Sequence, residues 1–334
     1  MADKVLNLAV LGVGRIGRVH ALTISKNKAA RLAAVADAMP KAAKEVAAQY
    51  DCPVLSIDEI ATDASIHGVI ICTPTDTHAD LIEQFARAGK AIFCEKPIDL
   101  SVDRVRSCLA VVEECAVPLM LGFNRRFDAE MATLCQTVRN GAIGEVELVQ
   151  ITSRDPAPPP IGYIKVSGGI FRDMMIHDFD MARFILGEDP VSVSAQGSVL
   201  VDPEIGIAGD YDTATAILKT ASGKQATVTN SRRASYGYDQ RVEVHGSKGM
   251  AQITNHRETS VEVATDQGFK REPLKAFFME RYMRAYEREL DVFIDTVNSG
   301  SAPDPAGIDG LKALIIADGA TRSAKEGGLI QLQY

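Results

Sequence analysis

The 334-residue sequence lacks an excess of basic residues and contains no run of lysine or arginine. Its 36 Lys and Arg stand against 44 Asp and Glu, which gives a formal net charge of −8 at pH 7. Proteins that follow nucleic-acid phosphates normally carry a concentrated basic face. The composition therefore argues against a nucleic-acid-binding protein.

Long apolar runs are also missing, and no stretch approaches the length of a membrane span. The N-terminal segment, residues 1–14, places charge before an apolar run. That run is short, rich in glycine and without a small-residue cleavage site. We therefore expect neither a membrane protein nor a signal peptide.

The sequence has no Cys-x-x-Cys pair, no internal repeat and no low-complexity tract. Its six cysteines all lie in the first half of the chain, mostly within apolar runs. They are Cys52, Cys72, Cys94, Cys108, Cys115 and Cys135. This pattern is typical of buried thiols in a reducing compartment, so we expect a cytoplasmic protein without a cysteine-based metal or redox site.

The length exceeds that of a single hydrophobic core, which predicts two domains. From Leu6 to Phe123, short apolar runs rich in β-formers alternate with amphipathic helical patterns. Continuous apolar strands that alternate with helices are typical of a parallel sheet covered on both faces. We predict an α/β protein with a doubly wound, dinucleotide-binding Rossmann domain over residues 1–123.

The pattern changes after Phe123. One strand is predicted over residues 145–155, and five more follow one another between residues 191 and 255, separated by turn signals. Two helices are predicted over residues 274–298 and about 305–325. We predict an α+β domain over residues 124–334, with a largely antiparallel, open-faced sheet that binds substrate. Because two helices are too few to cover both faces of the sheet, we expect an exposed apolar face to drive oligomerisation.

A glycine-rich motif, GVGRIG, directly follows the first predicted strand and opens a helix. Gly12 permits a tight turn, Gly14 lets the backbone approach a pyrophosphate, and Gly17 permits close helix packing. Arg15 and Ile16 complete this loop at the positive end of a helix dipole. The alternative is a tight turn without a ligand.

Asp37 ends the second predicted strand, 20 residues after Gly17. A carboxylate at this place can accept hydrogen bonds from the adenosine ribose and would repel a 2′-phosphate. The motif therefore predicts NAD rather than NADP as the cofactor.

Two further strand ends should point at the same crevice, because ligands of doubly wound folds bind beyond the carboxyl ends of the strands. The first is CTPTDTH and the second is CEKP. Pro97 biases Lys96 away from the helical region and so holds its ammonium group in the cleft. The alternative for Lys96 is a solvated surface lysine. The candidate cofactor contacts in these two segments are Thr73, Pro74, Thr75, His78, Glu95 and Lys96.

The stretch GGIFRDMMIHDFDMAR, residues 168–183, places ionisable side chains in an otherwise apolar helical pattern. In one continuous helix, Asp173, His177 and Asp180 would share a single stripe. Asp173 could instead be a helix cap, and His177 could be a core histidine. A metal pair is a third alternative, but no HExxH motif or Cys/His cluster supports it, so we expect no metal.

Together these motifs resemble the glucose-fructose oxidoreductase/inositol dehydrogenase family over essentially the whole chain. The resemblance is carried by GVGRIG, by Glu95-Lys96-Pro97, and by Gly168-Gly169 followed by Asp173 and His177. Within that family, four stretches are most similar to inositol dehydrogenases. They are residues 122–128, 153–160, 235–250 and 280–293.

The resemblance implies an NAD-dependent, homotetrameric enzyme that oxidises a cyclitol alcohol to a ketone, as in myo-inositol to 2-keto-myo-inositol. It implies that Lys96, Asp173 and His177 form the catalytic trio. It also implies that Asn124 and Arg125 lie at the nicotinamide end of the cleft. The further residues implied near the polyol are Ser153, Asp155, Tyr236 and Tyr282.

The chemistry of the trio suits this reaction. Transfer of a hydride from a secondary carbinol carbon requires the hydroxyl proton to leave, and His177 is a suitable acceptor. Lys96 supplies positive charge where alkoxide character develops, and Asp173 can bind a substrate hydroxyl. One alternative is a dehydrogenase of scyllo-inositol, chiro-inositol or an aldose. Another is a dinucleotide-sensing regulator, which has no chemical need for the intact trio.

Overall fold

The computed structural model describes residues 5–334, and the chain forms two compact units. The first unit contains the chain up to Phe127 together with residues 284–311. The second contains residues 128–283 and 312–334. The compact units therefore do not follow a single cut at residue 123, because the chain returns to the first unit late in the sequence. The functional division at that residue remains a prediction.

The first unit is built on a five-stranded sheet in the order β2-β1-β3-β4-β5, and all its strand pairs are parallel. The strands are β1 (Leu6–Leu11), β2 (Ala30–Ala36), β3 (Gly68–Ile71), β4 (Ala91–Cys94) and β5 (Leu119–Leu121). They consist almost wholly of buried apolar residues, as expected for strands covered on both faces. The predicted doubly wound domain is confirmed.

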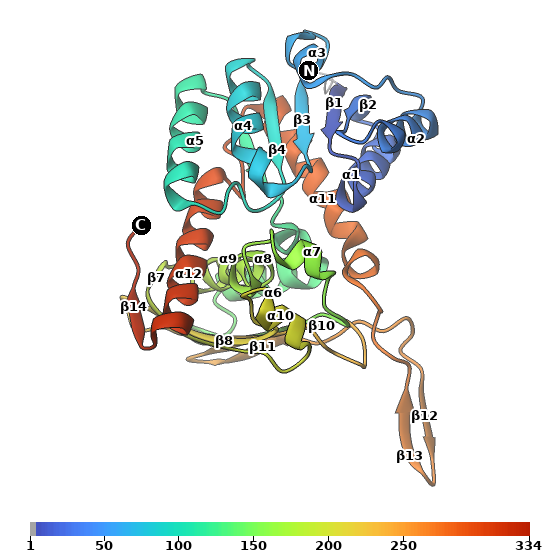
Figure 1. Ribbon diagram of the computed structural model, residues 1–334. Helices are drawn as coiled ribbons and strands as arrows, with labels where there is room; N and C mark the ends of the chain where they lie inside the picture. The colour runs from blue at the N-terminus through green and yellow to red at the C-terminus, as the bar shows by residue number, and fades with distance from the viewer. Residues whose placement is uncertain (1–4) are drawn as a thin grey trace. The chain divides into compact units, whose positions relative to one another are not determined.

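Helices flank this sheet (Figure 1). They are α1 (Arg15–Lys26), α2 (Pro40–Tyr50), α3 (Ile57–Thr62), α4 (His78–Arg87), α5 (Val102–Cys115) and the later part of α11 (Phe278–Ser299). Short 3₁₀ turns form η1 (Thr75–Thr77) and η2 (Asn124–Phe127). One core joins Ile24 of α1, Phe93 of β4 and Phe293 of α11, which explains why residues 284–299 belong to this unit.

The second unit contains a seven-stranded sheet in the order β11-β10-β6-β9-β8-β7-β14. Its strands are β6 (Val146–Arg154), β7 (Pro190–Ser198), β8 (Thr213–Thr220), β9 (Gln225–Ser231), β10 (Asp239–Gly246), β11 (Gly249–Ile253) and β14 (Leu329–Gln331). Only β6 and β9 pair in parallel. The predicted, largely antiparallel sheet is confirmed.

Helices cover one face of this sheet, as Figure 1 shows for α6, α8 and α9. The helices of the unit are α6 (Ala129–Arg139), α7 (Ile161–Ile164), α8 (Ile170–Asp173), α9 (Ile176–Leu186), α10 (Pro203–Ile207) and the later part of α12 (Gly307–Glu326). Met131, Phe179 and Ala317 join Val149 and Val228 of the sheet in one core. This face positions α8 and α9, the segment with the predicted catalytic residues.

The other face of the sheet is open, but the prediction that it is apolar is wrong. On β8, buried residues alternate with exposed ones, and the exposed ones include Thr215 and Lys219. Arg241 and His245 are exposed on β10. Ile217 is a large apolar exception on β8, with 48% of its surface exposed. The alternation therefore places polar side chains on the open face, and burial of that face would gain little from the hydrophobic effect.

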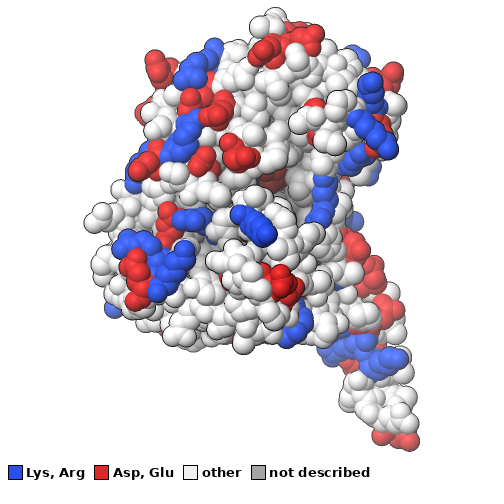
Figure 2. Space-filling view, in the orientation of Figure 1, with Lys and Arg blue, Asp and Glu red and all other residues white. Residues whose placement is uncertain are grey.

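A hairpin arm that the sequence patterns did not reveal belongs to the same unit. It consists of β12 (Glu262–Thr265) and β13 (Gly268–Arg271), and all of its strand residues are exposed. The arm carries Val263 and Phe269, whose exposed fractions are 52% and 78%. Figure 2 shows acidic atoms at its end and uncharged atoms next to them. Val263 and Phe269 are exposed on opposite faces of the arm.

Two expectations from composition can be compared with the structure. All six cysteines are free, as expected, but only Cys94, Cys108 and Cys135 are buried. The other three are partly exposed, so the prediction of six buried thiols is only half correct. Between residues 5 and 334, no helix is both long enough and apolar enough to span a membrane. The first four residues lie outside the described chain.

Candidate functional site

The glycine-rich loop has the geometry that a dinucleotide requires. Gly12 has φ +83°, and a Cβ there would lie 2.7 Å from the carbonyl carbon of Cys72. A Cβ at Gly17 would lie 1.8 Å from the carbonyl oxygen of Gly12, so close packing excludes any side chain. At Gly14, by contrast, a Cβ would meet no atom within 4 Å. The loop is therefore closed on the protein side and open at Gly14, where α1 begins at Arg15 and offers its positive end to a phosphate.

Asp37 follows β2 and holds this loop through two short hydrogen bonds. Its Oδ2 accepts from the amide of Val13 at 2.7 Å, and its Oδ1 accepts from the amide of Met39 at 2.7 Å. An ionised carboxylate has about four acceptor sites, so Asp37 can still accept from a ribose hydroxyl. The residue thus combines a structural role with the predicted site for the ribose.

His78 has a different environment from that of a cofactor contact. It is 2% exposed, and its ring nitrogens lie 2.8 Å from the carbonyl oxygens of Thr73 and Pro97. Both nitrogens therefore face backbone carbonyls, and the neutral ring donates to one of the two. This argues against the predicted direct contact with the cofactor. The ring instead ties the loop after β3, including Pro74 and Thr75, to the residue that follows Lys96.

Two ionisable residues, Glu95 and Lys96, directly follow β4. Along an extended chain, successive side chains point in opposite directions. The carboxylate of Glu95 lies 2.8 Å from Nε2 of His20, and a Cβ at Gly122 would come within 2.9 Å of it. Glu95, which was predicted to contact the cofactor, is therefore directed into the first unit. Lys96 is half-buried at the same strand end.

Asn124 and Arg125 lie in η2, directly after β5 and Phe123. Their exposed fractions are 5% and 4%. Buried polar residues at a strand end are held by local contacts, and they leave little surface for a ligand. Their contact with the nicotinamide remains a prediction.

The predicted continuous helix over residues 168–183 is wrong. α8 ends at Asp173 and α9 begins at Ile176, and between them the amide of Met175 donates to the carbonyl of Ile170, five residues back, at 2.9 Å. This wide, π-type turn interrupts the helical register. Asp173 and His177 consequently lie on different helices, and Asp180, only 1% exposed, belongs to the interior.

Asp173 is held by two residues that sequence patterns did not single out. Tyr163 donates its hydroxyl to Oδ1 of Asp173 at 2.8 Å. The guanidinium of Arg232, only 1% exposed, lies 3.6 Å from Asp173 and 3.3 Å from Asp210. Burial raises the pKa of Asp210, although hydrogen bonds from backbone amides oppose the shift. Arg232 therefore lies between two carboxylates and fixes Asp173 at the end of α8.

A buried polar network supports α9 from the sheet. Asp178, fully buried, accepts from the hydroxyl of Ser153 at 2.6 Å and from the side-chain amide of Asn230 at 2.8 Å. The Ser153 hydroxyl also lies 3.0 Å from Gln240. Ser153 is itself fully buried, which argues against the predicted substrate contact. Its role is to anchor Asp178 one residue after His177.

We expect Asp178→Ala to lower the free energy of unfolding by about 2–4 kcal/mol, because two buried donors would lose their acceptor. Ser153→Ala removes only one donor and is expected to cost about 1 kcal/mol. Urea denaturation of both variants measures this difference. Equal stability of the Asp178→Ala variant and the wild type would contradict a structural role for this network.

Tyr236 and Tyr282, both predicted near the polyol, differ in accessibility. Tyr282 is 1% exposed and packs edge-on against Tyr238, with ring centroids 6.0 Å apart. Tyr236 is 45% exposed. Asp155 is half-buried, and its amide donates to the carbonyl of Ser231 at 2.9 Å. Among the three, Tyr236 and Asp155 have surface left for a ligand.

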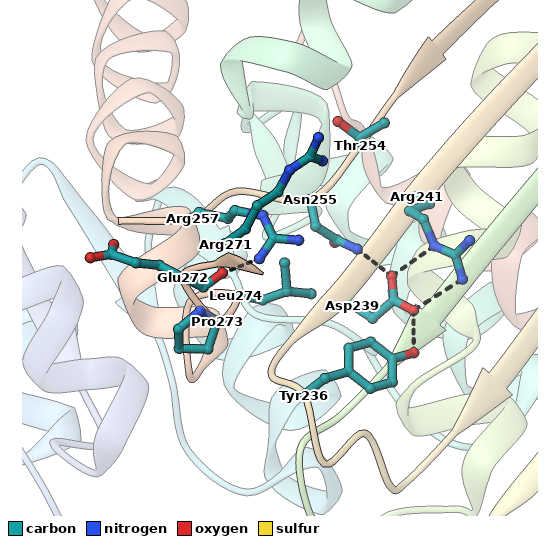
Figure 3. Close-up of a pocket in the computed structure, with 10 residues that line it drawn as sticks. All are labelled: Tyr236, Asp239, Arg241, Thr254, Asn255, Arg257, Arg271, Glu272, Pro273 and Leu274. Atoms are coloured by element: carbon teal, nitrogen blue, oxygen red, sulfur yellow. Dashed lines mark hydrogen bonds and ion pairs between the residues drawn. The ribbon is translucent and has the colours of Figure 1, made fainter. Parts of the chain in front are cut away.

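Tyr236 lines an open pocket of about 690 Å³, shown in Figure 3. Its hydroxyl accepts from Arg154 and donates to Asp239, both at 2.7 Å. Burial acts to raise the pKa of Asp239, but hydrogen bonds, led by Arg241, outweigh it and lower the pKa. The pocket lining includes neither Asp173 nor His177. Tyr236 thus belongs to an ion network, and its contact with substrate remains a prediction.

Comparisons with known proteins cover almost the whole chain. Residues 6–123 match the model of an oxidoreductase family with an NAD-binding Rossmann fold, and residues 131–252 match a GFO/IDH/MocA C-terminal domain. An inositol 2-dehydrogenase of Rhizobium meliloti is 60% identical over 96% of this chain and 97% of its own length. A myo-inositol 2-dehydrogenase of Thermotoga maritima is 44% identical over 98% of this chain and 99% of its own length.

Solved structures show the same likeness. The crystal structure of a putative myo-inositol dehydrogenase from Sinorhizobium meliloti has a TM-score of 0.96 and 58% identity, covering 98% of this chain and all of its own. A scyllo-inositol dehydrogenase from Lactobacillus casei, solved with bound NAD(H) and scyllo-inositol, has a TM-score of 0.92 and 28% identity. That match covers 98% of this chain and 99% of the other.

Proposed function

Because the chain belongs to the GFO/IDH/MocA family of oxidoreductases, we propose that it is an NAD-dependent inositol 2-dehydrogenase. It oxidises myo-inositol to 2-keto-myo-inositol. The observation that carries this proposal is the 60% identity to an inositol 2-dehydrogenase along nearly the entire length of both chains. The open backbone at Gly14 and the carboxylate of Asp37 fit a dinucleotide with a free ribose.

In the proposed reaction, His177 accepts the proton of the substrate hydroxyl. NAD, when bound, supplies the acceptor for the hydride. Lys96 stabilises the negative charge that develops on the substrate oxygen. Asp173, oriented by Tyr163 and paired with Arg232, accepts a hydrogen bond from a neighbouring hydroxyl of the polyol.

A panel of substrates tests the proposal. NADH formation is expected to be fastest with myo-inositol, slower with scyllo-inositol and chiro-inositol, and slowest with aldoses such as glucose. A higher kcat/KM for another polyol would change the substrate assigned to the enzyme but not the type of reaction. A regulator that only senses the dinucleotide would bind NAD and reduce it with none of these compounds.

We expect Asp37→Ser combined with Ala38→Arg to admit NADP, because the change removes a carboxylate that repels the 2′-phosphate and adds a cation that binds it. The kcat/KM ratio of NAD to NADP measures the effect. Since Asp37 also anchors the amides of Val13 and Met39, melting temperature must be followed in parallel. Equal use of both cofactors by the wild type would contradict the assignment of Asp37 to the ribose.

The proposed assembly is a cytoplasmic homotetramer. The free cysteines support a reducing compartment. The family resemblance implies a homotetramer, and the exposed arm supports a contact between copies of the chain. An isolated two-stranded hairpin is marginally stable in water, so packing against a second copy would stabilise it. Val263 and Phe269 provide one exposed apolar side chain on each face of the arm for such a contact.

We expect Val263→Ser with Phe269→Ser to weaken association, because both apolar side chains leave the proposed contact. Light scattering at micromolar concentration should report a smaller average mass for this variant. Lys28→Ser, at an exposed position outside the arm, is the control and should leave the mass unchanged. A wild type that is monomeric at this concentration would remove the proposal.

A further inference from the structure

Three ionisable side chains meet inside the first unit. His20 comes from α1, Glu95 from the end of β4, and Glu289 from α11. One ligand-type atom of each lies within 4.8 Å of those of the other two. His20 is 1% exposed and Glu289 is fully buried. Two carboxyl groups and one imidazole therefore share a space that is almost closed to water.

Glu289 is the unusual member of this cluster. Within residues 5–334, neither of its carboxyl oxygens has a hydrogen-bond partner. An ionised carboxylate that is buried, unpaired and close to a second carboxylate carries a large desolvation penalty and a repulsion. The structure accordingly favours a form of Glu289 without charge.

The surroundings of the cluster strengthen this argument. The ring of His20 packs edge-on against Phe93 and Tyr286, at centroid distances of 5.1 and 5.7 Å. Burial, reinforced by the charge of Glu95, raises the pKa of Glu289 well above its ordinary value. The thiols of Cys72 and Cys94 are further titratable neighbours, and burial raises the pKa of both. His20 and Glu95 form the remaining pair, 2.8 Å apart.

We propose that Glu289 is a neutral acid beside Glu95, and that it is a positioning residue for Lys96. A proton on Glu289 removes the repulsion between the two carboxyl groups. Glu95 then keeps its contact with His20, 2.8 Å away, while the carboxyl group of Glu289 lies within 4.8 Å. Because Glu95 directly precedes Lys96, this arrangement fixes the strand end that presents the ammonium group. The link to catalysis rests on the proposed function.

The same three groups could instead hold a divalent cation, since His and Glu are common ligands. The enclosure by aromatic rings favours the proton, because a hydrated cation needs a path of entry and usually a fourth ligand. We therefore treat the metal as an outcome that the experiment must distinguish.

Infrared spectroscopy of the full-length protein at neutral pH tests the protonation state without any substrate. A protonated carboxyl gives a carbonyl stretch well separated from that of a carboxylate. The wild type should show this band, and Glu289→Gln should lose it. Glu287→Gln, an exposed residue two positions away on α11, is the control and should retain it. Absence of the band from the wild type overturns the proposal. So does a stoichiometric metal in the wild type that Glu289→Gln lacks.

Kinetics test the positioning role. Glu289→Gln keeps a neutral hydrogen-bond donor and should keep kcat within about threefold, whereas Glu289→Leu should lower kcat about ten- to a hundredfold by displacing Lys96. The KM for NAD should change little in either variant. If both variants keep the wild-type kcat, the positioning role is wrong. Because the infrared band requires no turnover, failure of the proposed function would leave the proton assignment standing.

Discussion

Replacing His177 by alanine is expected to lower kcat by about 10² to 10⁴, the usual contribution of a positioned proton acceptor. The binding of NAD should stay nearly unchanged, because the proposed contacts of the dinucleotide are Gly12, Gly14, Gly17 and Asp37 in the other unit. Titration of NAD followed by calorimetry, together with steady-state kinetics on myo-inositol, measures the two effects separately. The kcat/KM of the wild type should rise with pH near neutrality, as a histidine base requires.

A core-histidine role predicts the opposite pattern. His177 is half-buried at the start of α9, next to the buried Asp178, so its removal could destabilise this segment. In that case the alanine variant would have a lower melting temperature and would keep much of the wild-type kcat per folded molecule. His177→Gln, which keeps a polar side chain of similar size but removes the base, is the matched variant. For a catalytic base, we expect each variant to keep the wild-type melting temperature and to have a much lower kcat.

The sequence allowed the first unit to be predicted closely because its signals are local. Continuous apolar strands, a glycine loop at a strand end and an acidic residue after β2 each have one dominant structural meaning. The return of residues 284–299 to the same core was not predictable in this way. Amphipathic spacing in α11 indicates an apolar face but not the sheet against which that face packs.

In the second unit, most strands of the large sheet were predicted, but the wide turn between α8 and α9 and the hairpin arm were not. The wide turn at Met174 and Met175 carries no Gly or Pro, so the sequence pattern predicts one continuous helix. The hairpin arm has too few residues and too little alternation to give a clear signal. Whether the arm is exposed depends on how it packs against the rest of the protein, and the residue pattern of the arm does not indicate this.

The candidate site was predicted better in its residue types than in its contacts. Asp37 and the three glycines have the local geometry that their predicted roles need. Glu95 and Ser153, however, are directed into the protein by partners that lie 75 and 25 residues away in sequence, His20 and Asp178. Such long-range polar pairs leave no spacing in the sequence, and Arg232 beside Asp173 is a further example. They determine which ionisable residues are free to meet a ligand.

Lys96→Met is expected to lower kcat by about 10² to 10³, because it removes a positive charge that acts mainly in the transition state and keeps the apolar stem. The KM for NAD should change much less than kcat, and melting temperature should change little, since Lys96 is only half-buried. Lys44→Met, at an exposed position on α2, controls for the loss of one positive charge from the same unit. If Lys96 were a solvated surface lysine, the two variants would behave alike. Lys96→Arg refines the test, because a bulkier guanidinium keeps the charge but not the position of the ammonium group, and it should restore only part of the rate.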